Sequence, residues 1–114
     1  MEEYLGISPA NDADGVLQDV HWSAGILGYF PTYALGNLIS AQLWEKLQDD
    51  IPELSAQIRT GDYRDLLAWL REHVHQHGAK YEPQELVQRI VGQEIQTEPY
   101  LAYLTEKFTG VYQL

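Results

Sequence analysis

The chain has 114 residues, enough for a single domain of residues 1–114 with a buried core. Hydrophobic residues make up 45% and charged residues 21%, a composition typical of a folded protein rather than a disordered one. Seventeen acidic residues against seven basic ones give a formal charge of −10. A charge of this sign and size argues against nucleic acid and against anionic membrane surfaces as partners.

The absence of cysteine excludes disulfides and cysteine-based zinc sites, and it fits a reducing compartment. The apolar runs are far shorter than the ~20 residues that a membrane helix needs. The sequence Met1-Glu2-Glu3-Tyr4 also lacks the basic start of a signal peptide. These features predict a cytoplasmic protein with no membrane partner.

Glycines and basic residues are unevenly distributed along the chain. Five of the nine glycines lie in the first 36 residues, whereas the first basic residue is Lys46. Glycine-rich sequence favours turns and irregular structure. We therefore expect a loop-rich segment over residues 1–31 and a helical region over residues 32–114.

In chain order, residues 6–15 consist of turn and N-cap formers, and residues 16–22 follow with one or two predicted helical turns. Residues 23–31 contain two glycines and Pro31, which predict a loop. The first long helix is predicted over residues 32–48, because its apolar residues recur at spacings of three and four: Leu35, Leu38, Ile39, Leu43 and Leu47.

Four further helices are predicted over residues 52–58, 62–77, 83–91 and 97–114. Pro52 and Pro83 suit the first turn of a helix, and Asp62 and Thr97 suit the N-cap. Gly61, Gly78 and Gly92 mark the ends of the first three. No convincing strand is present in the pattern. The predicted fold is all-α, an irregular array of about five helices.

Three histidines near the end of one predicted helix are candidates for a metal site. His73 and His77 are four residues apart and would share a helix face, as two imidazoles that bind one ion require. The spacing matches the H-E-x-x-H motif, but Val74 stands where that motif has its glutamate. We favour the alternative that these imidazoles interact with the negative end of the helix dipole.

A second group of polar residues lies in the glycine-rich part of the chain. It combines an amide, a carboxylate, an imidazole and two phenols: Gln18, Asp19, His21, Tyr29 and Tyr33. No basic residue lies in this segment to neutralise Asp19. From residue types alone, the group is either a polar functional site or a hydrogen-bonded corner of the core.

This segment resembles a known enzyme family. Gly15, Gln18, Asp19, His21 and Trp22 match the G-x-x-Q-D-x-H-W motif of the thermostable carboxypeptidase Taq family of zinc metallocarboxypeptidases. The sequence from Gly28 to Gly36 resembles the same family, as does the sequence from Pro99 to Leu104 with Lys107. The likeness covers nearly the whole chain.

The resemblance implies that this chain is one part of a larger helical enzyme. Family members are several times longer, all-helical and usually homodimeric, and they hold zinc through an H-E-x-x-H helix and a downstream glutamate, which this sequence lacks. The chain therefore resembles the C-terminal portion, without its own metal site and inactive alone. The implied partners are peptide substrates, the missing N-terminal catalytic region and a second copy in a homo-oligomer. The implied cofactor is zinc or another divalent metal, held outside this chain.

By the same resemblance, His21 and one of Tyr29 or Tyr33 are the catalytic donors to the oxyanion of the tetrahedral intermediate. Gln18 and Asp19 are expected to contact substrate or to orient the catalytic groups. Asp19 has a second interpretation of equal weight, as a helix N-cap. Trp22 and Phe30 are expected to serve in packing rather than in contact with substrate.

The alternative function is a freestanding acidic helical module that binds proteins. Exposed apolar surface distinguishes the two hypotheses. A part of a larger enzyme should expose apolar residues between Val16 and Phe30, whereas an independent module should cover them.

Overall fold

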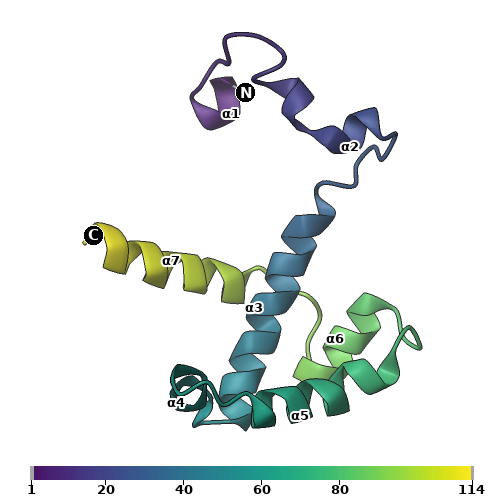
Figure 1. Ribbon diagram of the computed structural model, residues 1–114, viewed down its shortest axis with the longest axis vertical. Helices are drawn as coiled ribbons and strands as arrows, with labels where there is room; N and C mark the ends of the chain where they lie inside the picture. The colour runs from purple at the N-terminus through teal and green to yellow at the C-terminus, as the bar shows by residue number, and fades with distance from the viewer. Residues whose placement is uncertain (1, 114) are drawn as a thin grey trace. The chain divides into compact units, whose positions relative to one another are not determined.

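The computed structural model describes residues 2–113, and every regular element in this range is a helix. The all-α prediction is therefore confirmed. Residues 2–113 contain seven α-helices rather than about five, because two single-turn helices precede the longer ones. They are α1 (Glu2–Leu5), α2 (Val20–Ser23), α3 (Thr32–Asp50), α4 (Leu54–Arg59), α5 (Arg64–His73), α6 (Pro83–Val91) and α7 (Glu98–Tyr112), with 3-10 turns at Val16–Gln18 and His75–His77 (Figure 1).

The chain divides into two compact units, Met1–Ala34 and Leu35–Leu114. The first unit contains the glycine-rich sequence with α1, α2 and the first turn of α3. The second contains the rest of α3 and the four helices that follow. No helix within residues 2–113 is both long enough and apolar enough to cross a membrane.

The core of the second unit lies at the C-terminal end of α3. Leu47, Leu54 and Trp69 are buried together there, from α3, α4 and α5. Figure 1 shows α4 and α5 at this end of α3, with α6 beside α5. Further apolar residues pack around the cluster from α3, α4, α5 and α6 and from the turns after α3 and α5. They are Leu43, Ile51, Ile58, Leu66, Leu70, Val74 and Ile90.

A buried amide attaches the segment before α7 to α3. The Gln42 side chain is only 5% exposed. Its Nε2 donates to the Glu94 carbonyl, and its Oε1 accepts from the Gln96 backbone N–H, both at 2.9 Å. Because a buried polar group is costly unless it is paired, this match fixes the loop between α6 and α7 against α3.

The predicted helix over residues 62–77 is shorter than expected. The α-helix ends at His73, because Val74 leaves helical geometry with φ −120° and ψ −65°. His75–His77 then form a separate 3-10 turn. His73 contacts the Trp69 ring and His77 contacts the Tyr81 ring, so the two imidazoles do not share one continuous helix face.

The start of α5 also differs from the prediction. Tyr63, not Asp62, occupies the N-cap position. Asp62 lies one residue earlier, where its carboxylate accepts from the backbone and side chain of Arg64. These hydrogen bonds from Arg64 lower the pKa of Asp62 to about 2. The carboxylate still supports the helix start, but through Arg64 rather than as the cap.

Leu54 provides a test of the core in the second unit. Its side chain is 1% exposed, so Leu54→Ala leaves a cavity and should lower the free energy of unfolding by about 2–5 kcal/mol. The matched control is Leu67→Ala, because Leu67 lies on α5 but is 41% exposed. Urea denaturation followed by circular dichroism measures both. Equal losses in the two variants would contradict this account of the core.

Candidate functional site

The candidate site is built around Asp19, which lies between the 3-10 turn Val16–Gln18 and α2. Asp19 has extended backbone geometry, with φ −81° and ψ 98°, and it is the N-cap of α2. Its Oδ1 accepts from the His21 backbone N–H at 2.9 Å. The same oxygen lies 2.7 Å from Nδ1 of the His21 ring. The carboxylate therefore both caps the helix and holds the imidazole.

Gly15 and Gln18 shape the turn that leads to Asp19. Gln18 Nε2 donates to the Ala13 carbonyl at 2.5 Å, within the same loop. Gly15 is buried, and a Cβ at this position would come within 2.7 Å of the Pro9 side chain. Glycine is therefore required by close packing. Because the Gln18 amide donates to a backbone carbonyl of the same loop, it stabilises the loop conformation.

Three aromatic rings surround the His21 imidazole. The ring centroids of Tyr29, Phe30 and Tyr33 lie 5.4, 5.7 and 5.7 Å from that of His21. The Tyr33 hydroxyl is 3.5 Å from His21 Nε2. Gly28, with φ +74°, supplies the left-handed turn immediately before Tyr29 and Phe30. The structure thus brings Asp19, His21, Tyr29 and Tyr33 into one cluster.

The electrostatics of Asp19 favour its charged form. Partial burial raises the pKa of the carboxyl group, but hydrogen bonds from the His21 side chain, the His21 backbone and the Trp22 side chain lower it. The hydrogen bonds together outweigh the effect of burial, so the pKa of Asp19 lies below its ordinary value of 3.8. The carboxylate is consequently anionic at neutral pH and faces the Nδ1 side of the ring. This arrangement favours a proton on Nδ1.

The residues around this cluster are largely exposed. The side chains of Asp19 and His21 are partly covered, at 24% and 19% exposure. Trp22 is 59% exposed and Phe30 is 58% exposed, although the Phe30 ring packs against the rings of His21 and Tyr33. Neighbouring apolar side chains are exposed as well: Val16, Leu17, Val20, Ile26 and Leu27. The first unit therefore presents its apolar residues to solvent.

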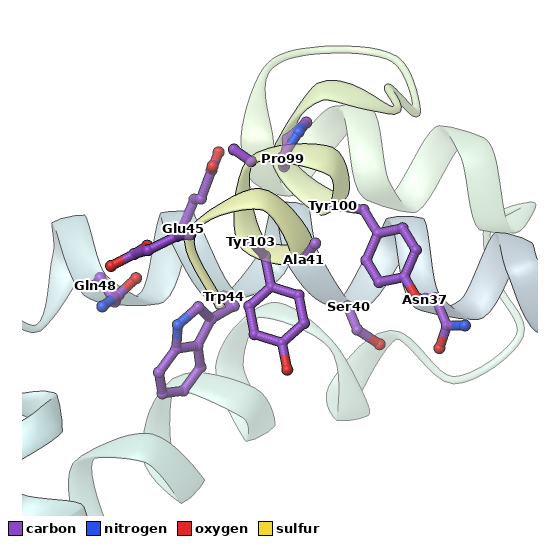
Figure 2. A pocket seen from close by; sticks show the side chains of 11 residues that line it. Asn37, Ser40, Ala41, Trp44, Glu45, Gln48, Pro99, Tyr100 and Tyr103 are labelled. Atoms are coloured by element: carbon purple, nitrogen blue, oxygen red, sulfur yellow. The ribbon is translucent and has the colours of Figure 1, made fainter. Parts of the chain in front are cut away.

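A separate cavity of about 640 Å³ lies in the second unit, between α3 and α7. Figure 2 shows Trp44 and Tyr103 side by side in it, with Glu45 and Gln48 toward one end and Asn37 and Tyr100 toward the other. No local sequence pattern indicates this cavity, because its lining combines residues of α3 with residues of α7 that lie more than fifty positions later in the chain. It contains none of the predicted site residues.

The residues that the structure describes do not gather a set of metal ligands. Within residues 2–113, no group of three or more histidine, aspartate or glutamate side chains is placed to hold one. The pair Asp19 and His21 faces three aromatic rings rather than a third ligand. Its chemistry is that of a positioned imidazole with a neighbouring phenol.

The described residues form an all-helical chain with one imidazole–carboxylate–phenol cluster, and comparison with known proteins gives its family. The profile of the carboxypeptidase Taq (M32) metallopeptidases matches residues 1–108. The chain belongs to this family. The prediction made from the motif between Gly15 and Trp22 is thereby confirmed.

Individual relatives support the assignment. Carboxypeptidase 1 of Bacillus subtilis is 42% identical over 113 residues, and thermostable carboxypeptidase 1 of Thermus thermophilus is 40% identical over 110 residues. These matches cover 99% and 96% of this chain but only 23% and 22% of the relatives. The chain thus spans less than a quarter of the length of these proteins.

Solved structures show the same relationship. The crystal structure of the M32 carboxypeptidase from Deinococcus radiodurans R1 is 41% identical, with a TM-score of 0.92. The match covers 99% of this chain and 23% of that one. The fold of this chain is therefore similar to part of a longer M32 carboxypeptidase.

Acid should release the cap of α2. Because the pKa of Asp19 is lower in the folded chain than its ordinary 3.8, the stabilisation is complete above that value and is lost as the pH falls through the folded pKa. The chemical shift of the His21 backbone amide should follow this titration. Asp19→Ser, which caps without a titrating group, should remove it, and a persisting titration would contradict the assignment.

Proposed function

We propose that this chain is the C-terminal part of a zinc-dependent metallocarboxypeptidase that removes C-terminal amino acids from peptides. In this proposal His21 and Tyr33 donate hydrogen bonds at the reacting carbonyl, with Tyr29 beside them. The zinc ion, or another divalent metal, is held by the part of the protein outside this chain. The residues of this chain then supply a stretch of the active-site wall, and the chain alone does not hydrolyse peptides.

The observation that carries the proposal is the cluster of Asp19, His21 and Tyr33. A peptide carbonyl oxygen gains negative charge when it is attacked, and donors placed where that charge develops lower the barrier. Nε2 of His21 and the Tyr33 hydroxyl are 3.5 Å apart, so one oxygen atom in front of both can contact both. Removing such a donor costs on the order of 3 kcal/mol.

The exposed apolar residues of the first unit support the same proposal. A freestanding binding module would be expected to bury Leu17, Trp22 and Leu27, yet these are 68%, 59% and 72% exposed. Because the chain matches less than a quarter of each relative, we propose that the remainder of the peptidase covers them. Assembly into a homo-oligomer and a cytoplasmic location stay predictions.

A chimeric enzyme tests the role of His21. This chain replaces the matching 113 residues of the Bacillus subtilis carboxypeptidase 1. In the chimera, His21→Ala should lower kcat by about a hundredfold or more, because an oxyanion donor is lost. Its metal content should be unchanged. Activity is measured on a short peptide, and metal content by atomic absorption.

His75→Ala is the matched control, because His75 is exposed and lies in the 3-10 turn of the second unit. It should retain the activity of the chimera. An active His21→Ala chimera would refute the catalytic assignment. Metal loss in that variant would instead indicate a structural role at the metal site.

Assembly in trans tests whether the chain completes a larger enzyme. The remaining part of the Bacillus subtilis protein, without the matching 113 residues, is produced separately and mixed with this chain. A complex with peptidase activity that neither part has alone is expected. Leu27→Asp should weaken the complex, because it places a charge on an exposed apolar residue of the proposed contact surface. The absence of any complex in size-exclusion chromatography would favour the freestanding module.

A further inference from the structure

We propose that Asp19 is a positioning residue whose single oxygen Oδ1 sets both the start of α2 and the proton arrangement of His21, so that Nε2 works with Tyr33 rather than Tyr29. This inference rests on the proposed function. Beyond that function, it identifies Nε2 as the His21 nitrogen that donates and Tyr33 as the tyrosine paired with it. It also identifies Asp19 as the residue that orients the ring.

The geometry links the two tasks through one atom. Oδ1 lies 2.9 Å from the His21 backbone nitrogen and 2.7 Å from Nδ1 of the same residue. A carboxylate oxygen only accepts hydrogen bonds, so Nδ1 must carry a proton to bond with it. The backbone contact fixes the position of Oδ1, and Oδ1 in turn fixes the ring. The orientation of the imidazole is thereby coupled to the cap of α2.

With Nδ1 protonated, Nε2 is the nitrogen that is free to exchange a proton. In the neutral ring it has a lone pair and can accept a hydrogen bond from the Tyr33 hydroxyl. When Nε2 takes up a proton from solvent, it becomes a donor, and the phenol O–H is released. Both groups can then donate to one negatively charged oxygen. The only covalent bond formed is the N–H bond at Nε2, and the ring gains one positive charge. The anionic Asp19 faces the ring in both states.

The two tyrosines are not equivalent in this arrangement. Tyr33 lies in the first turn of α3 and brings its hydroxyl 3.5 Å from Nε2. Tyr29 lies in the preceding loop and approaches the imidazole with its ring, at 5.4 Å between centroids and an interplanar angle of 32°. The Tyr29 and Tyr33 rings meet edge to face at 5.9 Å. Tyr29 therefore supports the imidazole by packing, whereas Tyr33 presents its hydroxyl.

The tautomer of His21 is the decisive measurement. Long-range proton–nitrogen NMR correlations of the 114-residue chain are recorded well above the titration range of an imidazole. The wild-type chain should show His21 with its proton on Nδ1. In Asp19→Ser the signals should move to a mixture of tautomers, because serine retains a cap but has no anion for Nδ1. A proton on Nε2 in the wild type, or an unchanged Asp19→Ser spectrum, would overturn the inference.

Two controls separate this effect from general damage. Asp12→Asn removes one negative charge from the same unit and should leave the His21 signals unchanged. The Asp12 backbone carbonyl accepts hydrogen bonds from the Gly15 and Leu17 amides, and the substitution retains that carbonyl. The signals of His73, His75 and His77 lie in the second unit and should not move in either variant. A shift of His21 in Asp12→Asn would assign the effect to net charge and refute the role of Asp19.

The pairing with Tyr33 is tested in the chimeric enzyme. Tyr33→Phe should lower kcat at least tenfold with little change in KM, because a donor to the transition state is lost. Tyr29→Phe retains the ring that packs on His21 and should lower kcat less than Tyr33→Phe does. The reverse order would overturn the assignment of Tyr33. If the tautomer behaves as expected but His21→Ala remains active, the positioning role stands and the proposed function fails.

Discussion

The first unit depends on a short-range interaction between one carboxylate oxygen and two groups of the same residue. Asp19 Oδ1 accepts from the His21 backbone at 2.9 Å and contacts its ring at 2.7 Å. Charge-assisted contacts of this kind are strong only when the partners are held in place. Here the cap supplies that restraint, because α2 has a single turn and cannot position a side chain by its own length. The aromatic residues then close around an imidazole whose orientation is already set.

The two units are stabilised in different ways. In the second, Leu47, Leu54 and Trp69 form a buried cluster, and Gln42 secures the following loop with two hydrogen bonds. In the first, large apolar side chains are exposed and local hydrogen bonds and glycine turns define the chain path. The first unit is therefore ordered by local hydrogen bonds, and it exposes apolar surface that a contact with another protein segment could bury. That combination supports the proposal that another part of the protein covers the first unit.

The division of roles within the motif follows from these contacts. Gly15 allows the close approach of Pro9, and Gln18 supports the loop through the Ala13 carbonyl. Neither residue reaches the imidazole, whereas Asp19 does. Asp19 is at once a cap and an orienting carboxylate, so the two interpretations of this residue are compatible. The Trp22 side chain is exposed, and its hydrogen bond to the Asp19 carboxylate helps to lower the pKa of Asp19.

The sequence by itself determined the all-α class, the long helices and the family, because apolar spacing, proline and glycine positions and a specific motif are local signals. It also singled out His21. It did not determine the end of α5 at His73, since the backbone of Val74 responds to packing rather than to spacing. Only the tertiary structure distinguished Tyr33 from Tyr29, because both are phenols close in sequence and the difference lies in which hydroxyl reaches Nε2. Side-chain distances of this kind depend on how the loop and the first turn of α3 fold back on α2, and no local pattern encodes that path.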